Sequence, residues 1–94
     1  MNDINLNYSQ HCHVRCQQRG IETEVIDFIV RYGKHRNSHN DKKYYVNKKL
    51  LGKLKHKHKS FLKQFESKIL TIGVIVNERT VITAYRNNKK FLWN

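Results

Sequence analysis

His11, Arg15 and Arg19 are spaced four residues apart, and in a helix this spacing places their side chains in one row. An imidazole can transfer a proton near neutral pH, and a guanidinium can neutralise the charge that develops on a phosphoryl group. The row therefore has side chains suited to chemistry on a phosphodiester. The alternative interpretation is an exposed polar helix face with no chemical role.

Basic residues are concentrated in the middle of the chain. The 94 residues include 19 Lys or Arg and seven Asp or Glu, for a net charge of +12, and all but one unit of it lies between Arg31 and Lys68. This segregation indicates a polyanionic partner, with nucleic acid first and an anionic membrane or an acidic protein second. A solvated basic face that only keeps the chain in solution is an alternative. The side chains expected to follow an RNA backbone are Lys49, Lys53, His56, Lys57, Lys89 and Lys90.

Metal chemistry is not favoured by the residues present. The stretch His11–Cys16 (HCHVRC) together with His56 and His58 could supply zinc ligands, but there is no second cysteine pair. We therefore expect Cys12 and Cys16 to be small apolar residues on the buried side of a helix. His58 falls on the apolar stripe of the basic segment, so we expect a packed histidine there. The seven carboxylates are too scattered for a two-metal nuclease, so we expect neither metal nor cofactor.

Cleavage of a nucleic acid without metal favours RNA, because its 2′-OH is a built-in nucleophile. The protein then needs to supply a base, an acid and cations around the phosphate. Thr83, Tyr85 and Arg86 could join the His/Arg row in these roles, if the strand that carries them lies beside the first helix.

Two helices should open the chain. Ser9 is a typical N-cap and Gly20 a typical terminator, which predicts a helix over residues 10–19. Apolar residues at helical spacing predict a second helix from Glu22 to Tyr32 that ends at Gly33.

The remaining elements should be a sheet and a basic helix. Residues 34–41 have no periodicity and indicate a loop or an edge strand. After them we expect a strand at 43–47, a long basic helix at 48–66 and a central strand at 69–76. A two-residue connection at Asn77-Glu78 should then lead to a return strand at 80–86, with Val81, Thr83 and Tyr85 on one face. Residues 91–93 could add an edge strand or dock on the core. The pattern predicts one α+β domain over residues 1–94, in which two N-terminal helices and a basic helix pack on a small antiparallel sheet.

The stretch HCHVRCQQRGIETEVIDFIVRYGK resembles the opening of a family of small bacterial domains of unknown function. Their pattern is a His, an Arg four residues on, then Arg-Gly-Ile, then a helix that ends in Tyr-Gly. The tail VITAYRN resembles the family's closing strand. This family is similar to the RelE/barnase–EndoU–colicin (BECR) ribonuclease superfamily, whose toxins pack N-terminal helices against a four-stranded antiparallel sheet.

The resemblance implies a metal-independent endoribonuclease of toxin type that cleaves RNA (tRNA or mRNA) by 2′-OH attack, leaves a 2′,3′-cyclic phosphate, and is neutralised by an acidic antitoxin or immunity protein. It implicates His11 as the acid or base, with Tyr85 as a stacking or proton-transfer group. The other residues that it implicates are Arg15, Arg19, Thr83, Arg86 and a structural Gly20.

Two further functions remain open from the sequence. The same lysines could serve a non-catalytic RNA- or DNA-binding module, whose affinity would fall steeply with salt. Alternatively, the basic helix could lie on an anionic lipid surface. No apolar run is long enough for a membrane span and the polar N-terminal stretch lacks the core of a signal peptide, so we expect no membrane partner and a cytoplasmic location, or delivery into the cytosol of a target cell.

Overall fold

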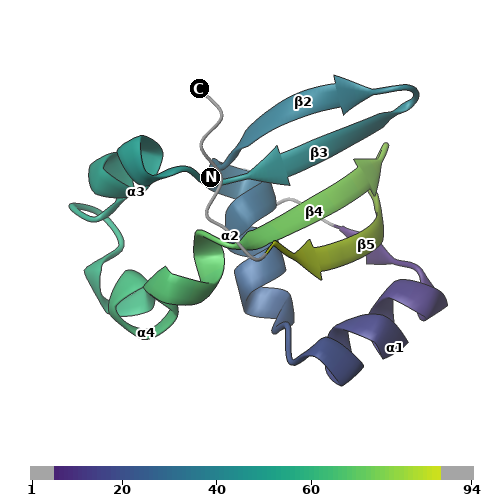
Figure 1. Ribbon diagram of the computed structural model, residues 1–94, viewed down its shortest axis with the longest axis horizontal. Helices are drawn as coiled ribbons and strands as arrows, with labels where there is room; N and C mark the ends of the chain where they lie inside the picture. Colours follow the sequence, from purple (N-terminus) through teal and green to yellow (C-terminus); the bar gives the residue numbers. More distant parts are fainter. Residues whose placement is uncertain (1–5, 88–94) are drawn as a thin grey trace.

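A computed structural model describes residues 6–87 of the chain and confirms the α+β class (Figure 1). The elements in chain order are β1 (Asn7–Tyr8), α1 (Gln10–Arg19), α2 (Thr23–Tyr32), β2 (Lys34–Ser38), β3 (Asp41–Tyr45), α3 (Lys48–Leu54), α4 (Lys59–Ile69), β4 (Ile72–Asn77) and β5 (Thr80–Arg86). The strands form one sheet in the order β1-β5-β4-β3-β2. β2 to β5 pair antiparallel, whereas β1 is parallel to β5, so the sheet is mixed rather than purely antiparallel.

The two N-terminal helices form where their caps predict. The hydroxyl oxygen of Ser9 accepts a hydrogen bond from the N–H of Cys12 at 3.0 Å, which begins α1. Gly20 has a φ of 65°, in the left-handed region that glycine adopts at little cost, and the N–H of Ile21 donates to the carbonyl of Cys16 at 2.9 Å. α2 ends at Gly33 as expected.

The prediction of a single basic helix over 48–66 is wrong, because the segment forms α3 and α4 with a turn between them. No apolar side chain occurs from Lys55 to Ser60, so a straight helix would carry its second half away from the core. Folding back instead lets Phe61 stack on Phe28 of α2, with ring centroids 4.7 Å apart. His58 begins α4 and packs between aromatic rings, 4.5 Å from the ring of Tyr32, as expected of a packed histidine.

The last hairpin differs from its prediction in two ways. Ile69 and Leu70 are buried at the end of α4, so β4 begins only at Ile72. The connecting residues are Glu78 and Arg79 rather than Asn77-Glu78, and Glu78 is the one with the left-handed φ of 54°. Asn77 stays in β4, where its side-chain amide donates to the carboxylate of Asp41 at 2.8 Å.

A β-bulge at Ile82 changes which side chains of β5 face inward. Val81 pairs with Val76 and Thr83 with Ile75. The strand β5 therefore advances two residues where β4 advances one, which leaves Ile82 as the extra residue of the bulge. Val81 therefore lies on the same face as Ala84, and both are fully buried, whereas Thr83 and Tyr85 lie on the opposite face. The prediction that Val81, Thr83 and Tyr85 share a face is wrong for Val81.

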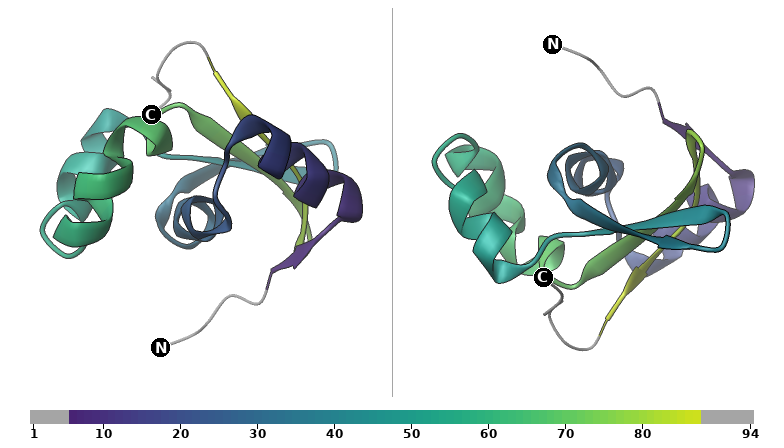
Figure 2. Two further views of the ribbon diagram at one scale, coloured as in Figure 1. Left: turned by 90° about the horizontal axis from the view of Figure 1, so that it is seen from below. Right: turned by 90° about the horizontal axis from the view of Figure 1, so that it is seen from above.

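The sheet separates two environments, which we call the inner and the outer face. The inner face carries Val74, Val76, Val81 and Ala84, which join one buried cluster with residues of α1, α2 and α4. The outer face carries a row of cross-strand partners, Arg36, Lys43, Ile75 and Thr83. Figure 2 shows the sheet nearly edge-on, with α2 against one side of it and the α3–α4 hairpin and α1 at opposite ends. The segment 91–93 and its predicted docking lie outside the described residues.

Candidate active site

Helix α1 lies along the edge of β5 that does not pair with β4. A further strand could otherwise pair along this edge. β1 covers only Thr80 and Val81 of this edge. Beyond it, the Ser9 hydroxyl donates to the carbonyl of Ile82 at 3.4 Å, and Nη1 of Arg19 donates to the carbonyl of Ala84 at 2.8 Å. Side chains of α1 thus satisfy carbonyl groups that an open sheet edge would leave exposed.

The two flanks of α1 face different surroundings. His13 and Gln17 lie on the flank that lines a pocket with the start of α2. His11 and Arg15 lie on the other side of the buried Cys12–Cys16 line, and both are exposed. α2 packs beneath the inner face of the sheet, and the flank with His13 and Gln17 lies beside it. The opposite flank, with His11 and Arg15, is therefore turned toward the side of β5 that belongs to the outer face.

The outer face next to this flank is cationic. The row from Arg36 through Lys43 and Ile75 leads to Thr83 on β5. The ammonium of Lys43 lies 5.1 Å from the ring centroid of Tyr85, a cation–π distance. Two predicted site residues, Thr83 and Tyr85, therefore share a face with the basic side chains of Arg36 and Lys43.

Tyr85 packs flat across Gly73 of the neighbouring strand. A Cβ atom at position 73 would come within 2.5 Å of the tyrosine ring, so only glycine leaves the ring this position. The hydroxyl of Tyr85 is buried and has no hydrogen-bond partner among residues 6–87. The ring therefore contacts both Gly73 and the ammonium of Lys43, and its hydroxyl is enclosed.

Arg19 and Arg86 meet at the C-terminal end of α1. Arg19 holds the carbonyl of Ala84, while Nη2 of Arg86 donates to the carbonyls of Arg19 at 3.2 Å and Gly20 at 3.1 Å. Arg86 lies on the face opposite to Thr83 and Tyr85. The structure therefore brings these two guanidiniums together, but as a clamp between α1 and β5 and apart from the outer-face row.

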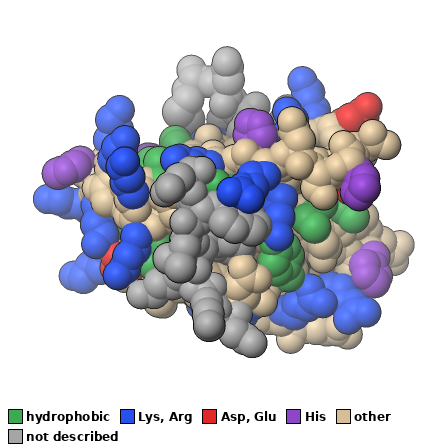
Figure 3. Space-filling view, turned by 45° about the horizontal axis from the view of Figure 1, so that its top comes forward, with side chains coloured by type: hydrophobic (Ala, Val, Ile, Leu, Met, Phe, Trp, Pro, Cys, Tyr) green, Lys and Arg blue, Asp and Glu red, His purple; other side chains and the backbone are tan. Residues whose placement is uncertain are grey.

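The lysines selected on the predicted basic helix lie elsewhere. Lys49, Lys53, His56 and Lys57 are exposed on α3 and in the turn after it, at the end of the molecule opposite α1 (Figures 1 and 2). Figure 3 shows Lys and Arg side chains gathered over this end, with further ones on the strands. They form a second basic surface, separate from the outer face. Lys89 and Lys90 lie outside the described residues.

Arg36 and Lys43 are the residues that sequence reasoning missed. Both belong to the basic segment, but the sequence of residues 34–41 is compatible with a loop as well as with an edge strand, so it predicts no register between Arg36 and the later strands. The signal was the strand candidate KYYVN, in which Lys43 and Tyr45 point to one side. Which side chains lie next to Lys43 and Tyr45 follows only from the pairing of β3 with β4.

The two cysteines are buried side by side, as expected, with their sulfur atoms 3.6 Å apart. Burial raises the pKa of the Cys12 thiol to about 12, and the hydrogen bond to Cys16 acts in the same direction. Among residues 6–87, no group of three or more His, Cys, Asp or Glu side chains is placed to hold a metal ion. None of the helices in this part of the chain combines the length and the apolar character needed to cross a membrane.

Comparisons of the chain with protein-family models, with curated proteins and with solved structures found no match.

Proposed function

We propose that this protein is a metal-independent endoribonuclease of toxin type, which cleaves single-stranded RNA by attack of the 2′-OH and leaves a 2′,3′-cyclic phosphate. One observation carries the proposal. The exposed His11 and Arg15 lie on the flank of α1 that is turned toward the outer face of the sheet, which carries Thr83 on β5 and, two strands away, Lys43 on β3. The sequence resemblance to BECR ribonucleases, together with the α+β class of the fold, is a further support for the proposal.

Each group has a role that follows from its chemistry and place. His11 exchanges the proton with the 2′-OH or with the leaving oxygen, since its imidazole is exposed and can both accept and donate a proton. Arg15 and Lys43 neutralise the charge on the phosphate in the transition state. The ring of Tyr85 stacks on a base, and Thr83 donates a hydrogen bond to the sugar-phosphate.

Arg19 and Arg86 act in this proposal mainly as positioning residues. Their bonds to the carbonyls of Ala84, Arg19 and Gly20 hold α1 against β5 and thereby set where His11 and Arg15 lie. The lysines of α3 extend the RNA-binding surface away from the cleavage site. An acidic antitoxin or immunity protein neutralises the enzyme in the cytosol, because a net charge of +12 favours an acidic partner.

The test is cleavage of a fluorescent single-stranded RNA in EDTA by purified protein, with the products identified by mass spectrometry. His11→Ala is expected to abolish cleavage and leave RNA affinity within a few-fold. His13→Ala is the matched control, since His13 is an exposed histidine on the opposite flank of the same helix, and it should cleave like the wild type. Equal cleavage by the His11 and His13 variants would remove His11 from the mechanism.

A non-catalytic RNA- or DNA-binding module is the second candidate. The bonding of Arg19 and Arg86 to backbone carbonyls favours it, because these two guanidiniums already have a structural role. This function predicts intact RNA in the same assay and an affinity that falls steeply with salt concentration. Product formation in EDTA by the wild type, lost in His11→Ala, would exclude it.

A further inference from the structure

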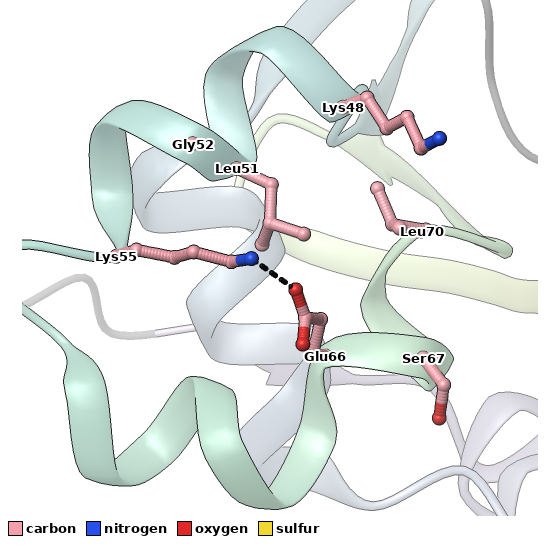
Figure 4. A pocket seen from close by; sticks show the side chains of 7 residues that line it. All are labelled: Lys48, Leu51, Gly52, Lys55, Glu66, Ser67 and Leu70. Atoms are coloured by element: carbon pink, nitrogen blue, oxygen red, sulfur yellow. Dashed lines mark ion pairs between the residues drawn. The ribbon is translucent and has the colours of Figure 1, made fainter.

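The α3–α4 hairpin contains a groove that the RNA chemistry does not use. A cavity of about 480 Å³ lies between the two helices, with Leu51 and Leu70 at its floor and Lys48 at its rim (Figure 4). A second cavity of about 440 Å³ shares Lys55 and Glu66 with the first and adds the apolar Leu62. The two hollows form a groove with an apolar floor, divided by the Lys55–Glu66 ion pair of 2.6 Å.

Gly52 lines the groove and contributes no side chain to its wall. It lies in the middle of α3, where glycine lowers helix stability relative to alanine. Within residues 6–87, no atom lies within 4 Å of the point where a Cβ would be, so packing among these residues does not require glycine here. A glycine in a helix, facing a groove, allows the backbone of another segment to approach closely.

The rim of the groove is mainly cationic. Its cationic side chains are Lys48, Lys55, Lys59 and Lys63, with His56 beside them, and its one lining acid is Glu66. Lys49 and Lys53 line neither cavity, because they lie on another side of α3. The lysines expected to bind RNA and the lysines of the groove are therefore different side chains.

We propose that this groove binds an amphipathic helix of an acidic partner protein, with apolar side chains on the floor and Asp or Glu side chains against the lysine rim. Helix-in-groove recognition uses an apolar floor, and the lysines of the rim add charge complementarity to an acidic helix. The inference rests on the proposed function, in that the bound helix belongs to the neutralising partner. Because the groove and the outer face lie on different elements, the partner can be held at the α3–α4 end while His11 stays at the other.

RNA is the competing occupant, and the lining of the groove argues against it. A phosphate backbone gains nothing from a floor of Leu51, Leu62 and Leu70, and one of the cations beside that floor, Lys55, is already paired with Glu66. An amphipathic helix can bury apolar side chains there, and its acidic flanks can pair with the rim.

The experiment is an NMR titration of isotope-labelled full-length protein with two synthetic helical peptides. Both have leucines at the i, i+3, i+4 and i+7 positions, and one has glutamates on its flanks whereas the other has lysines. The acidic peptide is expected to shift the amide signals of Leu51, Gly52, Ser67 and Leu70, and the basic peptide to bind at least tenfold more weakly.

Variants separate the groove from the RNA surface. Gly52→Phe fills the open space beside α3 and should weaken the acidic peptide at least tenfold, while Gly52→Ala should weaken it by less. Lys48→Glu with Lys63→Glu should also weaken the peptide. The matched control, Lys49→Glu with Lys53→Glu, makes the same change of charge outside the groove and should lower RNA affinity without affecting the peptide. Unchanged thermal unfolding of each variant is the check on folding.

Three results would overturn the inference: equal affinity for both peptides, peptide-induced shifts outside the groove, or RNA shifting the same amides with loss of binding in Gly52→Phe. The last would make the groove part of the nucleic-acid surface. Failure of the proposed function is a separate outcome, since a protein that cleaves no RNA can still bind the acidic peptide in the groove.

Discussion

Arg86, near the end of β5, donates a hydrogen bond to the carbonyl of Gly20, the left-handed residue that ends α1. The same guanidinium nitrogen reaches the carbonyl of Arg19, whose own side chain bonds to the carbonyl of Ala84. Arg19 and Arg86 lie 67 positions apart in the chain, and the side chain of each donates to backbone carbonyls at or near the other. This clamp sets the position of α1 on the edge of β5, and with it the position of His11.

Arg86→Ala should lower the free energy of unfolding by about 1 kcal/mol, because it removes hydrogen bonds and a cation from the C-terminal end of a helix. Arg86→Lys keeps the charge without the fork of donors and should fall between the two. Urea denaturation measures both. If the alanine variant is as stable as the wild type, Arg86 does not hold α1.

Tyr85→Phe should leave stability unchanged or raise it by up to about 1 kcal/mol, because the lost hydroxyl is buried without a partner among residues 6–87. The same variant should cleave RNA at close to the wild-type rate, since stacking needs only the ring. A large loss of cleavage with normal stability would show instead that the hydroxyl takes part in proton transfer.

Gly73→Ala should destabilise the protein by about 1–3 kcal/mol, because the added methyl group would overlap the ring of Tyr85. Removing the ring should remove most of this cost, so Gly73→Ala should be much milder in a Tyr85→Ala background. A double-mutant cycle in urea measures the difference. Equal costs in the two backgrounds would contradict the contact.

Glu22 joins the start of α2 to the end of α4 through Lys68, whose ammonium lies 2.8 and 3.0 Å from the two carboxylate oxygens. The hydrogen bond from Lys68 holds the pKa of Glu22 below its ordinary value of 4.5. A carboxylate with a lowered folded-state pKa stabilises the protein above its unfolded-state pKa, and this contribution is lost as the pH falls through the folded-state pKa.

Glu22→Gln should therefore be less stable than the wild type at pH 7, by less than about 1 kcal/mol because the pair is partly exposed. The difference should shrink as the pH falls below 4.5 and vanish in strong acid. Denaturation curves at several pH values give this profile, and a difference that does not depend on pH would rule out the ion pair as its source.

Cys12 should react slowly with iodoacetamide at pH 8 in the native protein, since only the thiolate is nucleophilic and burial raises the pKa of this thiol to about 12. Cys16 is buried as well, at 4% exposure. Both thiols should become alkylated quickly in urea. Rapid labelling of the native protein, followed by mass spectrometry, would show that α1 opens from the edge of β5.

Local signals in the sequence were sufficient for α1 and α2, because Ser9, Gly20 and Gly33 act on neighbouring backbone groups and the apolar spacing of α2 is itself helical. The burial of Cys12 and Cys16, the packing of His58 and the central place of β4 also followed from the order of side chains along the chain.

Tertiary structure alone decided how these elements meet. The turn after α3 depends on the stacking of Phe61 on Phe28, and the inward position of Val81 depends on a bulge that appears only when β5 pairs with β4. The same pairing places Lys43 over Tyr85 and leaves Arg86 on the other face. Propensity and periodicity act over a few residues, whereas register and facing are set by contacts between segments far apart in the chain. The sequence by itself therefore determined which side chains capable of acid–base or phosphate chemistry the protein has, and only the fold decided which of them share a surface.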